Sequence, residues 1–113
     1  MSLRSAINGA EPTRSEIDQM QGPVLLEFGT DWCGYCRALA PHVAELRKQF
    51  PLVKYINIED GKGLPLGRSF QVRLWPNFVF MRDGHIVRQL ARPSSKELRE
   101  GFEAVGGASE AST

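Results

Sequence analysis

The 113-residue chain contains few of the residues on which several classes of protein depend. It has 2 cysteines and 2 histidines, His42 and His85, and no second Cys-x-x-Cys pair, so it lacks the four ligands of a structural zinc site. Its 14 basic and 13 acidic residues give a net charge of +1, without the basic excess of a nucleic-acid-binding domain. No apolar run approaches the roughly 20 residues of a membrane span. We therefore expect no metal site, no nucleic-acid partner and no membrane contact.

The first twenty residues also lack the apolar centre of a secretory signal. On this basis we expect a cytoplasmic protein. A signal removed on export would instead imply the periplasm, an oxidising compartment. The hydrophobic content of 42% suffices for one ordinary domain, which we predict at residues 5–106, followed by a flexible small and polar tail at 107–113.

Hydrophobic periodicity predicts alternating helices and strands, and hence an α/β domain. A parallel pairing is expected at the first crossover and an antiparallel hairpin later, with Asp83-Gly84 as its turn. Pro41 falls inside a predicted helix and should kink it. The predicted elements are a short helix at 13–21, a buried strand at 22–28, an amphipathic helix at 36–50, a strand at 52–60, a short helix and return loop at 64–72, a hairpin at 77–90 and a closing helix at 94–105.

The two cysteines lie in the stretch "TDWCGYCRAL", as Cys33 and Cys36. A disulfide that only braces the fold would close a four-residue loop, which removes little unfolded-state entropy, ~2 kcal/mol against ~3 for fifteen residues. Covalent haem requires a histidine directly after the second cysteine, where this chain has Arg37. The pattern favours thiol–disulfide exchange.

The predicted layout supplies the chemistry for that exchange. Cys33 falls at the junction of strand and helix, where unpaired N–H groups and the positive end of the helix dipole favour a thiolate. Cys33 is therefore the expected nucleophile. Cys36, on the same helical face, can attack the mixed disulfide that Cys33 forms with a substrate, so it is the expected resolving thiol. Gly34 and Tyr35 should set the turn geometry between them.

The stretch "VLLEFGTDWCGYC" resembles the strand and Trp-Cys-Gly-Pro-Cys motif of the thioredoxin superfamily, and Pro41 is similar to that family's helix-kinking proline. "LWPNFVFMRDG" resembles the second signature, in which Pro76 takes the place of a cis-proline against the cysteines. The resemblance implies a thioredoxin-like three-layer α/β/α sandwich with a central mixed β-sheet. It also implies a protein-disulfide reductase with no cofactor beyond its redox-active Cys33–Cys36 pair.

The resemblance further implies a substrate site. The Trp75–Pro76 bond would be cis, and the Trp75 backbone would pair with the extended chain of the substrate. Trp32, beside an exposed sulfur, would form the rim of an apolar patch together with Tyr35 and Trp75.

Glu27 is a carboxylate within a strand that is otherwise apolar. The family has an aspartate at this position, beneath the resolving cysteine, where it assists proton transfer. We therefore interpret Glu27 as a general base for Cys36, directly or through a water. The alternative is an edge-exposed glutamate with no role.

Three residues depart from the thioredoxin pattern: Tyr35 replaces a proline, Tyr55 a lysine near the buried acid, and Trp75 a smaller isoleucine. Gly-Tyr between the cysteines is found in bacterial periplasmic disulfide isomerases. We expect a monomer that reduces disulfide-containing proteins and is recharged by a reductase that the sequence does not identify. An oxidant or isomerase, and a binding module whose cysteines are incidental, stay open as alternatives.

Overall fold

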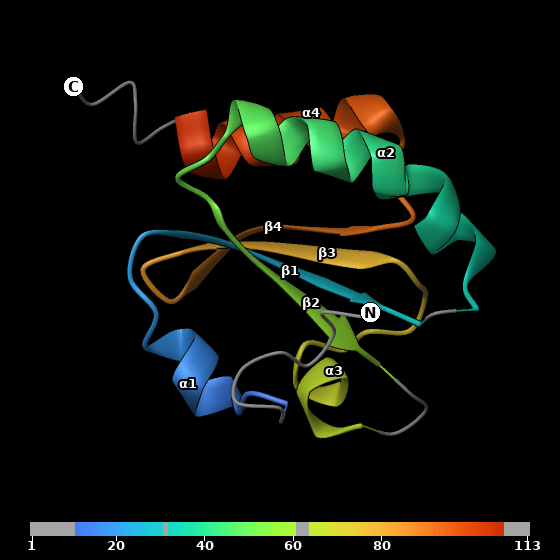
Figure 1. The fold of residues 1–113 in the computed structure, drawn as a ribbon. Coiled ribbons are helices and arrows are strands. Elements are labelled where there is room, and N and C mark those ends of the chain that lie inside the picture. The colour runs from blue at the N-terminus through green and yellow to red at the C-terminus, as the bar shows by residue number, and fades with distance from the viewer. Residues whose placement is uncertain (1–10, 31, 61–63, 108–113) are drawn as a thin grey trace.

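A four-stranded sheet lies between two pairs of helices in the computed structural model, which describes residues 11–30, 32–60 and 64–107. Helices α2 and α4 cover one face of the sheet, and α1 and α3 lie against the other (Figure 1). The predicted three-layer α/β/α arrangement is confirmed. In chain order the elements are α1 (Arg14–Asp18), β1 (Pro23–Gly29), α2 (Gly34–Gln49), β2 (Lys54–Glu59), α3 (Pro65–Ser69), β3 (Asn77–Arg82), β4 (His85–Ala91), α4 (Ser95–Phe102) and a π-helical turn, η2 (Glu103–Gly107).

The strands lie in the order β2-β1-β3-β4. β1 is parallel to β2 and antiparallel to β3, and β4 returns antiparallel to β3, so the sheet is mixed as expected. α2 forms the crossover between the two parallel strands. At the hairpin turn Asp83 and Gly84 both have positive φ, 51° and 81°, as a type I′ turn requires.

The helix starts refine the predictions. Thr13 caps α1 and Ser94 caps α4, each within a capping box. α2 begins at Gly34 rather than at Cys36, because the side chain of Cys33 serves as its N-cap. Cys33 therefore lies at the N-cap of this helix and Cys36 in its first turn.

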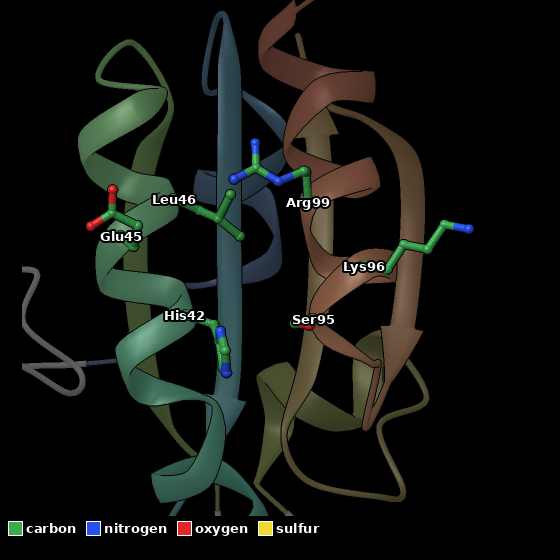
Figure 2. A pocket seen from close by; sticks show the side chains of 6 residues that line it. All are labelled: His42, Glu45, Leu46, Ser95, Lys96 and Arg99. Carbon is green, nitrogen blue, oxygen red and sulfur yellow. The ribbon is translucent and has the colours of Figure 1, made fainter.

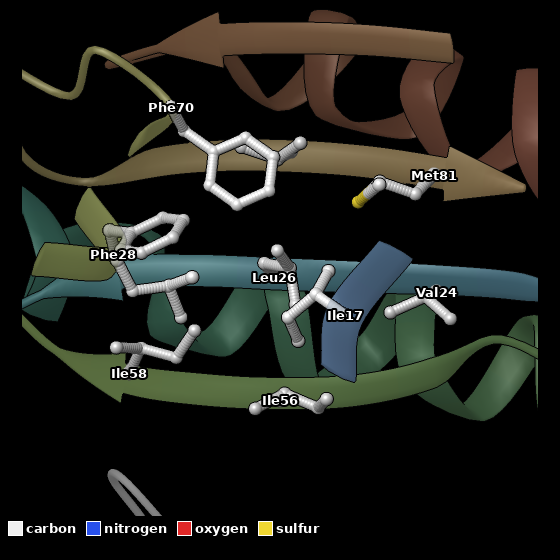
Figure 3. Packing of buried hydrophobic residues seen from close by; sticks show 10 residues of the cluster. Ile17, Val24, Leu26, Phe28, Ile56, Ile58, Phe70 and Met81 are labelled. Atoms are coloured by element: carbon white, nitrogen blue, oxygen red, sulfur yellow. The ribbon is translucent and has the colours of Figure 1, made fainter. Parts of the chain in front are cut away.

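The alternation along β1 divides the core between the two faces of the sheet. Val24, Leu26 and Phe28 point toward α1 and α3, while Leu25 and Glu27 point toward α2 and α4. Figure 3 shows the first of these clusters, which is entirely hydrocarbon and sulfur. Its buried members are Ile17, Val24, Leu26, Phe28, Ile56, Ile58, Leu66, Phe70, Val79 and Met81.

The proposed domain bounds of 5–106 stay a prediction. The predicted tail lies outside the described residues except for Gly107, the last residue of η2. Pro41 lies inside α2, as the sequence indicates. Among the described helices, none is both long and apolar enough to cross a membrane.

Candidate active site

The two cysteines occupy the N-terminal end of α2, just beyond the end of β1. Cys33 is the N-cap, and the backbone N–H of Cys36 donates to its sulfur with an N···S distance of 3.2 Å. Both residues are free thiols in this structure and both are buried, with 6% and 5% of their surface exposed. An N–H donor and the positive end of a helix dipole both stabilise negative charge on the Cys33 sulfur.

The Cys36 thiol holds its proton tightly. The pKa of Cys36 is raised from 9.0 to about 12, mainly by burial, and its hydrogen bond with Cys33 and the negative charges of Cys33 and Glu27 contribute in the same direction. A hydrogen bond with the backbone of Thr30 acts weakly in the opposite direction. At neutral pH, Cys36 is therefore a protonated thiol that cannot attack a disulfide until a base removes its proton.

Glu27 is buried on the central strand β1, with 4% of its surface exposed, so its interpretation as an edge-exposed side chain is wrong. The hydroxyl of Tyr55, on the neighbouring strand β2, donates to Glu27 Oε1. Asn57 Nδ2 in turn donates to the Tyr55 hydroxyl at 2.6 Å, and the guanidinium of Arg47 lies 4.1 Å from the centre of the Tyr55 ring. Burial, with the adjacent Glu27 charge, raises the pKa of Tyr55, so this hydroxyl remains a donor.

Trp75 and Pro76 precede β3, and the peptide bond between them is cis, as the resemblance implies. The Trp75 indole N–H donates to Asp60 Oδ2 at 2.8 Å. Asp60 is itself buried in space left by Gly67, where a Cβ atom would lie 2.3 Å from Asp60 Oδ1. Trp75 is thus fixed in place by a buried carboxylate at the end of β2.

The aromatic rim lies outside the buried sulfurs. Trp32 is 68% exposed and its ring meets that of Trp75 edge to face, with 5.5 Å between centroids. Tyr35 is 58% exposed. The expectation of an exposed sulfur beside Trp32 is wrong, because Cys33 is covered while the aromatic rings around it remain accessible.

Arg92, in the loop that follows β4, connects two parts of this rim. Its Nε donates to the Trp75 carbonyl oxygen and its backbone N–H to the Pro76 carbonyl oxygen, both at 2.9 Å. Its guanidinium carbon lies 4.3 Å from the centre of the Tyr35 ring. The side chain of Arg92 therefore lies across the residues predicted to receive a substrate.

A separate hollow of about 340 Å³ lies between α2 and α4, lined by the residues labelled in Figure 2. His42 lines this hollow, and neither cysteine does. Within the described ranges, no group of three or more histidine, cysteine, aspartate or glutamate side chains could hold a metal ion.

The thioredoxin family model matches residues 7–104. The chain belongs to the thioredoxin family. Thioredoxin Asp f 28 of Aspergillus fumigatus is 32% identical over 85 residues, which are 74% of this chain and 79% of that protein. Thioredoxin H5 of Arabidopsis thaliana is 31% identical over 84 residues, which are 74% of this chain and 71% of that protein.

The fold agrees with this assignment. The reduced form of thioredoxin 2 from Pseudomonas aeruginosa PAO1 superposes with a TM-score of 0.75 and is 52% identical, over 86% of this chain and 91% of that one. Thioredoxins reduce protein disulfides with their own cysteines and without a cofactor. This member of the family is accordingly a thiol–disulfide oxidoreductase whose redox centre is its Cys-Gly-Tyr-Cys motif.

Sequence reasoning missed two residues of this thioredoxin site. Asp60 follows the strand β2, and its position was noted only as a strand end. Arg92 was not singled out, although a basic residue immediately after a predicted strand and before Pro93 indicates a cation at one end of the sheet. Tyr55 was recognised as a departure from the family, but not as the hydrogen-bond partner of Glu27.

Proposed function

We propose that Cys33 opens a protein disulfide and that Cys36 resolves the intermediate. The observation that carries this assignment is the N-cap geometry, in which the Cys36 N–H donates to the Cys33 sulfur. That bond directs an N–H donor at the Cys33 sulfur, while the Cys36 thiol, with its pKa raised to about 12, keeps its proton. The two thiols are therefore unequal before any substrate arrives.

The exchange proceeds in two steps. The Cys33 thiolate attacks one sulfur of the substrate disulfide, which forms a mixed disulfide and releases the other substrate sulfur as a thiolate that takes up a proton. Cys36, once deprotonated, attacks the Cys33 sulfur, forms the Cys33–Cys36 disulfide and releases the second substrate thiol. Two electrons pass from the protein to the substrate.

Glu27 is the base that we propose for the second step. Its carboxyl is buried on the face of β1 that points toward α2, and its charge raises the pKa of Cys36. Both facts support a carboxyl close enough to receive the Cys36 proton, directly or through a water. The Tyr55 hydroxyl holds the carboxyl in place.

The substrate chain is proposed to lie along the aromatic rim and to pair with the Trp75 backbone beside Pro76. Trp32, Tyr35 and Trp75 supply accessible aromatic surface for it. At Gly34 an added Cβ would meet nothing within 4 Å, so this residue leaves the approach to Cys33 open. Extended pairing with backbone groups would accommodate many sequences.

We also propose thioredoxin reductase as the electron donor, because the family is reduced by that enzyme. The reductase would return two electrons and two protons to the Cys33–Cys36 disulfide. A monomer in the cytoplasm is the arrangement most consistent with the soluble thioredoxins among the relatives.

The test compares single-cysteine variants on an insulin disulfide. We expect Cys33→Ser to lose all reaction and Cys36→Ser to accumulate a mixed disulfide, seen by mass spectrometry. Reaction by Cys33→Ser together with inertness of Cys36→Ser would reverse the assignment. In a Glu27→Gln variant, the resolving step should slow about 100-fold at pH 7. Wild-type rates from pH 6 to 9 would remove Glu27 from the mechanism.

The direction of exchange is tested by the reduction potential of the Cys33–Cys36 pair. Equilibration in thiol buffers, followed by alkylation and mass spectrometry, should give a value near the roughly −270 mV of thioredoxin. A value of about −120 to −180 mV would instead indicate an oxidant or isomerase.

A further inference from the structure

Arg92 is the cation of the substrate rim, and its side chain is only partly engaged. Nε is bonded to the Trp75 carbonyl oxygen, and the guanidinium plane lies against the Tyr35 ring. Within residues 11–30, 32–60 and 64–107, no carboxylate forms an ion pair with it. Its two terminal amino groups therefore keep donors available for a ligand.

The backbone of Arg92 shows that this placement is specific. Its φ of 49° lies in the left-handed region, which glycine adopts freely and which other residues enter at a conformational cost. The hydrogen bonds to the Trp75 and Pro76 carbonyl oxygens and the contact with Tyr35 offset this cost. Together these contacts hold the Arg92 guanidinium against Tyr35, which lies between the two cysteines in the sequence.

We propose that Arg92 makes the protein selective for disulfides that carry an acidic side chain next to the reacting cysteine. The inference rests on the proposed function, in which the substrate chain pairs with the Trp75 backbone. A neutral substrate must displace Arg92 from the Trp75 carbonyl oxygen and offers the guanidinium no new partner. An acidic side chain gives the displaced guanidinium a carboxylate, which it can bind through two parallel N–H···O bonds.

The charge of Arg92 acts on substrate binding and takes no part in the electron transfer. The bonds formed and broken are still those between Cys33, Cys36 and the substrate sulfurs. Arg92 should therefore change the rate constant for capture of the substrate and leave the reduction potential of the Cys33–Cys36 pair nearly unchanged.

The experiment uses two short cystine peptides that are identical except for Glu or Gln beside the cysteine. Stopped-flow fluorescence of Trp32 and Trp75 follows oxidation of the reduced protein and gives kcat/KM for each peptide. Because a neighbouring charge alters the intrinsic reactivity of a disulfide, each rate is divided by the rate with dithiothreitol. We expect the normalised Glu-to-Gln ratio to be about ten for the wild type at low salt and to fall in high salt.

Two substitutions at Arg92 separate its charge from its shape. Arg92→Gly suits the positive φ, so the loop should retain its conformation, and it removes the guanidinium. We expect the ratio to fall to about one, with the Glu peptide slower and the Gln peptide faster than in wild type. Arg92→Lys keeps the charge without the planar fork and should give an intermediate ratio.

The matched control is Arg88→Gln, which removes one positive charge from β4 at a position opposite Phe80 and outside the aromatic rim. This variant should keep the wild-type ratio. An unchanged ratio in Arg92→Gly, or an equal fall in Arg88→Gln, would overturn the proposal. If the wild type reduces both peptides at the same normalised rate, the proposed selectivity is wrong and the proposed function stands. If it reduces neither peptide, the proposed function is wrong and the inference fails with it.

Discussion

The two faces of β1 differ in what they bury. Toward α1 and α3 the strand presents Val24, Leu26 and Phe28, which belong to a cluster of buried apolar side chains. Toward α2 and α4 it presents Leu25 and then Glu27, a carboxyl that accepts a hydrogen bond from the Tyr55 hydroxyl and whose charge raises the pKa of Cys36. One strand thus contributes apolar side chains to one layer and a buried carboxyl to the other.

This difference separates stability from chemistry. Apolar burial is the dominant favourable term in folding, and the buried apolar cluster on the face toward α1 and α3 supplies a large part of it. On the other face a polar cluster is removed from water. The hydrogen bonds from the Tyr55 hydroxyl and the Asn57 amide offset the free-energy cost of that desolvation. The hydrogen-bonded Glu27 and the apolar cluster around Leu26 therefore lie on opposite faces of the same strand.

The largest expected effect comes from the apolar face. Leu26→Ala should lower the free energy of unfolding by about 3 kcal/mol, because a fully buried side chain is replaced by a cavity. Urea denaturation measures this loss. The rate of insulin reduction, measured well below the midpoint of unfolding, should stay close to that of the wild type.

Glu27→Gln, one position along the strand, is the opposing variant. It should slow the resolving step while changing the free energy of unfolding far less than Leu26→Ala does. A Leu26→Ala protein that is fully stable, or that loses exchange activity while folded, would contradict the division between the two faces.

Much of the fold follows from local patterns that the sequence displays. Two such patterns are the alternation from Val24 to Phe28, which predicts a strand, and the helical spacing of Leu39, Val43 and Leu46. Both patterns are clear because the side chains of each element differ between its two faces. The Asp83-Gly84 turn is equally local, since both residues must adopt positive φ. The position of Cys33 at a helix start was predictable for the same reason.

The remainder depends on contacts between segments far apart in the chain. The bond from Trp75 to Asp60 joins two loops, and that from Arg92 to Trp75 joins the loops at either end of a hairpin. Hydrophobic periodicity cannot predict such a hydrogen bond, because side chains in a loop do not alternate between faces in a regular way. The burial of Cys33 was likewise missed, since it depends on the residues packed around the helix start.

A second and smaller effect should appear at alkaline pH. Burial raises the pKa of the Cys36 thiol from 9.0 in water to about 12 in the folded protein. Between these values the unfolded state binds fewer protons than the folded state, so the free energy of unfolding falls as pH rises; below pH 9 this contribution is constant. From pH 8 to pH 10 the wild type should lose about 1.4 kcal/mol more than a Cys36→Ser variant.

Tyr55 shifts in the same direction, so both proteins should lose stability above pH 10, and only the difference between them reports on Cys36. Urea denaturation at the two pH values measures that difference. Parallel curves for the wild type and Cys36→Ser would mean that the folded environment does not hold the Cys36 proton. The polar face would then be as accessible to water as a surface site.

The smallest effect tests the hydroxyl that replaces a lysine in this family member. Tyr55→Phe keeps the ring beneath Arg47 and removes only the donor to Glu27, so we expect a loss of about 1 kcal/mol in the free energy of unfolding at pH 7. Tyr35→Phe is the matched control, because it removes a hydroxyl from an exposed ring and should change stability little. Equal losses in the two variants would show that the Tyr55 hydroxyl does not support the buried carboxyl. A larger loss in Tyr55→Phe would show that the polar face of β1 depends on this partner, as the apolar face depends on Leu26.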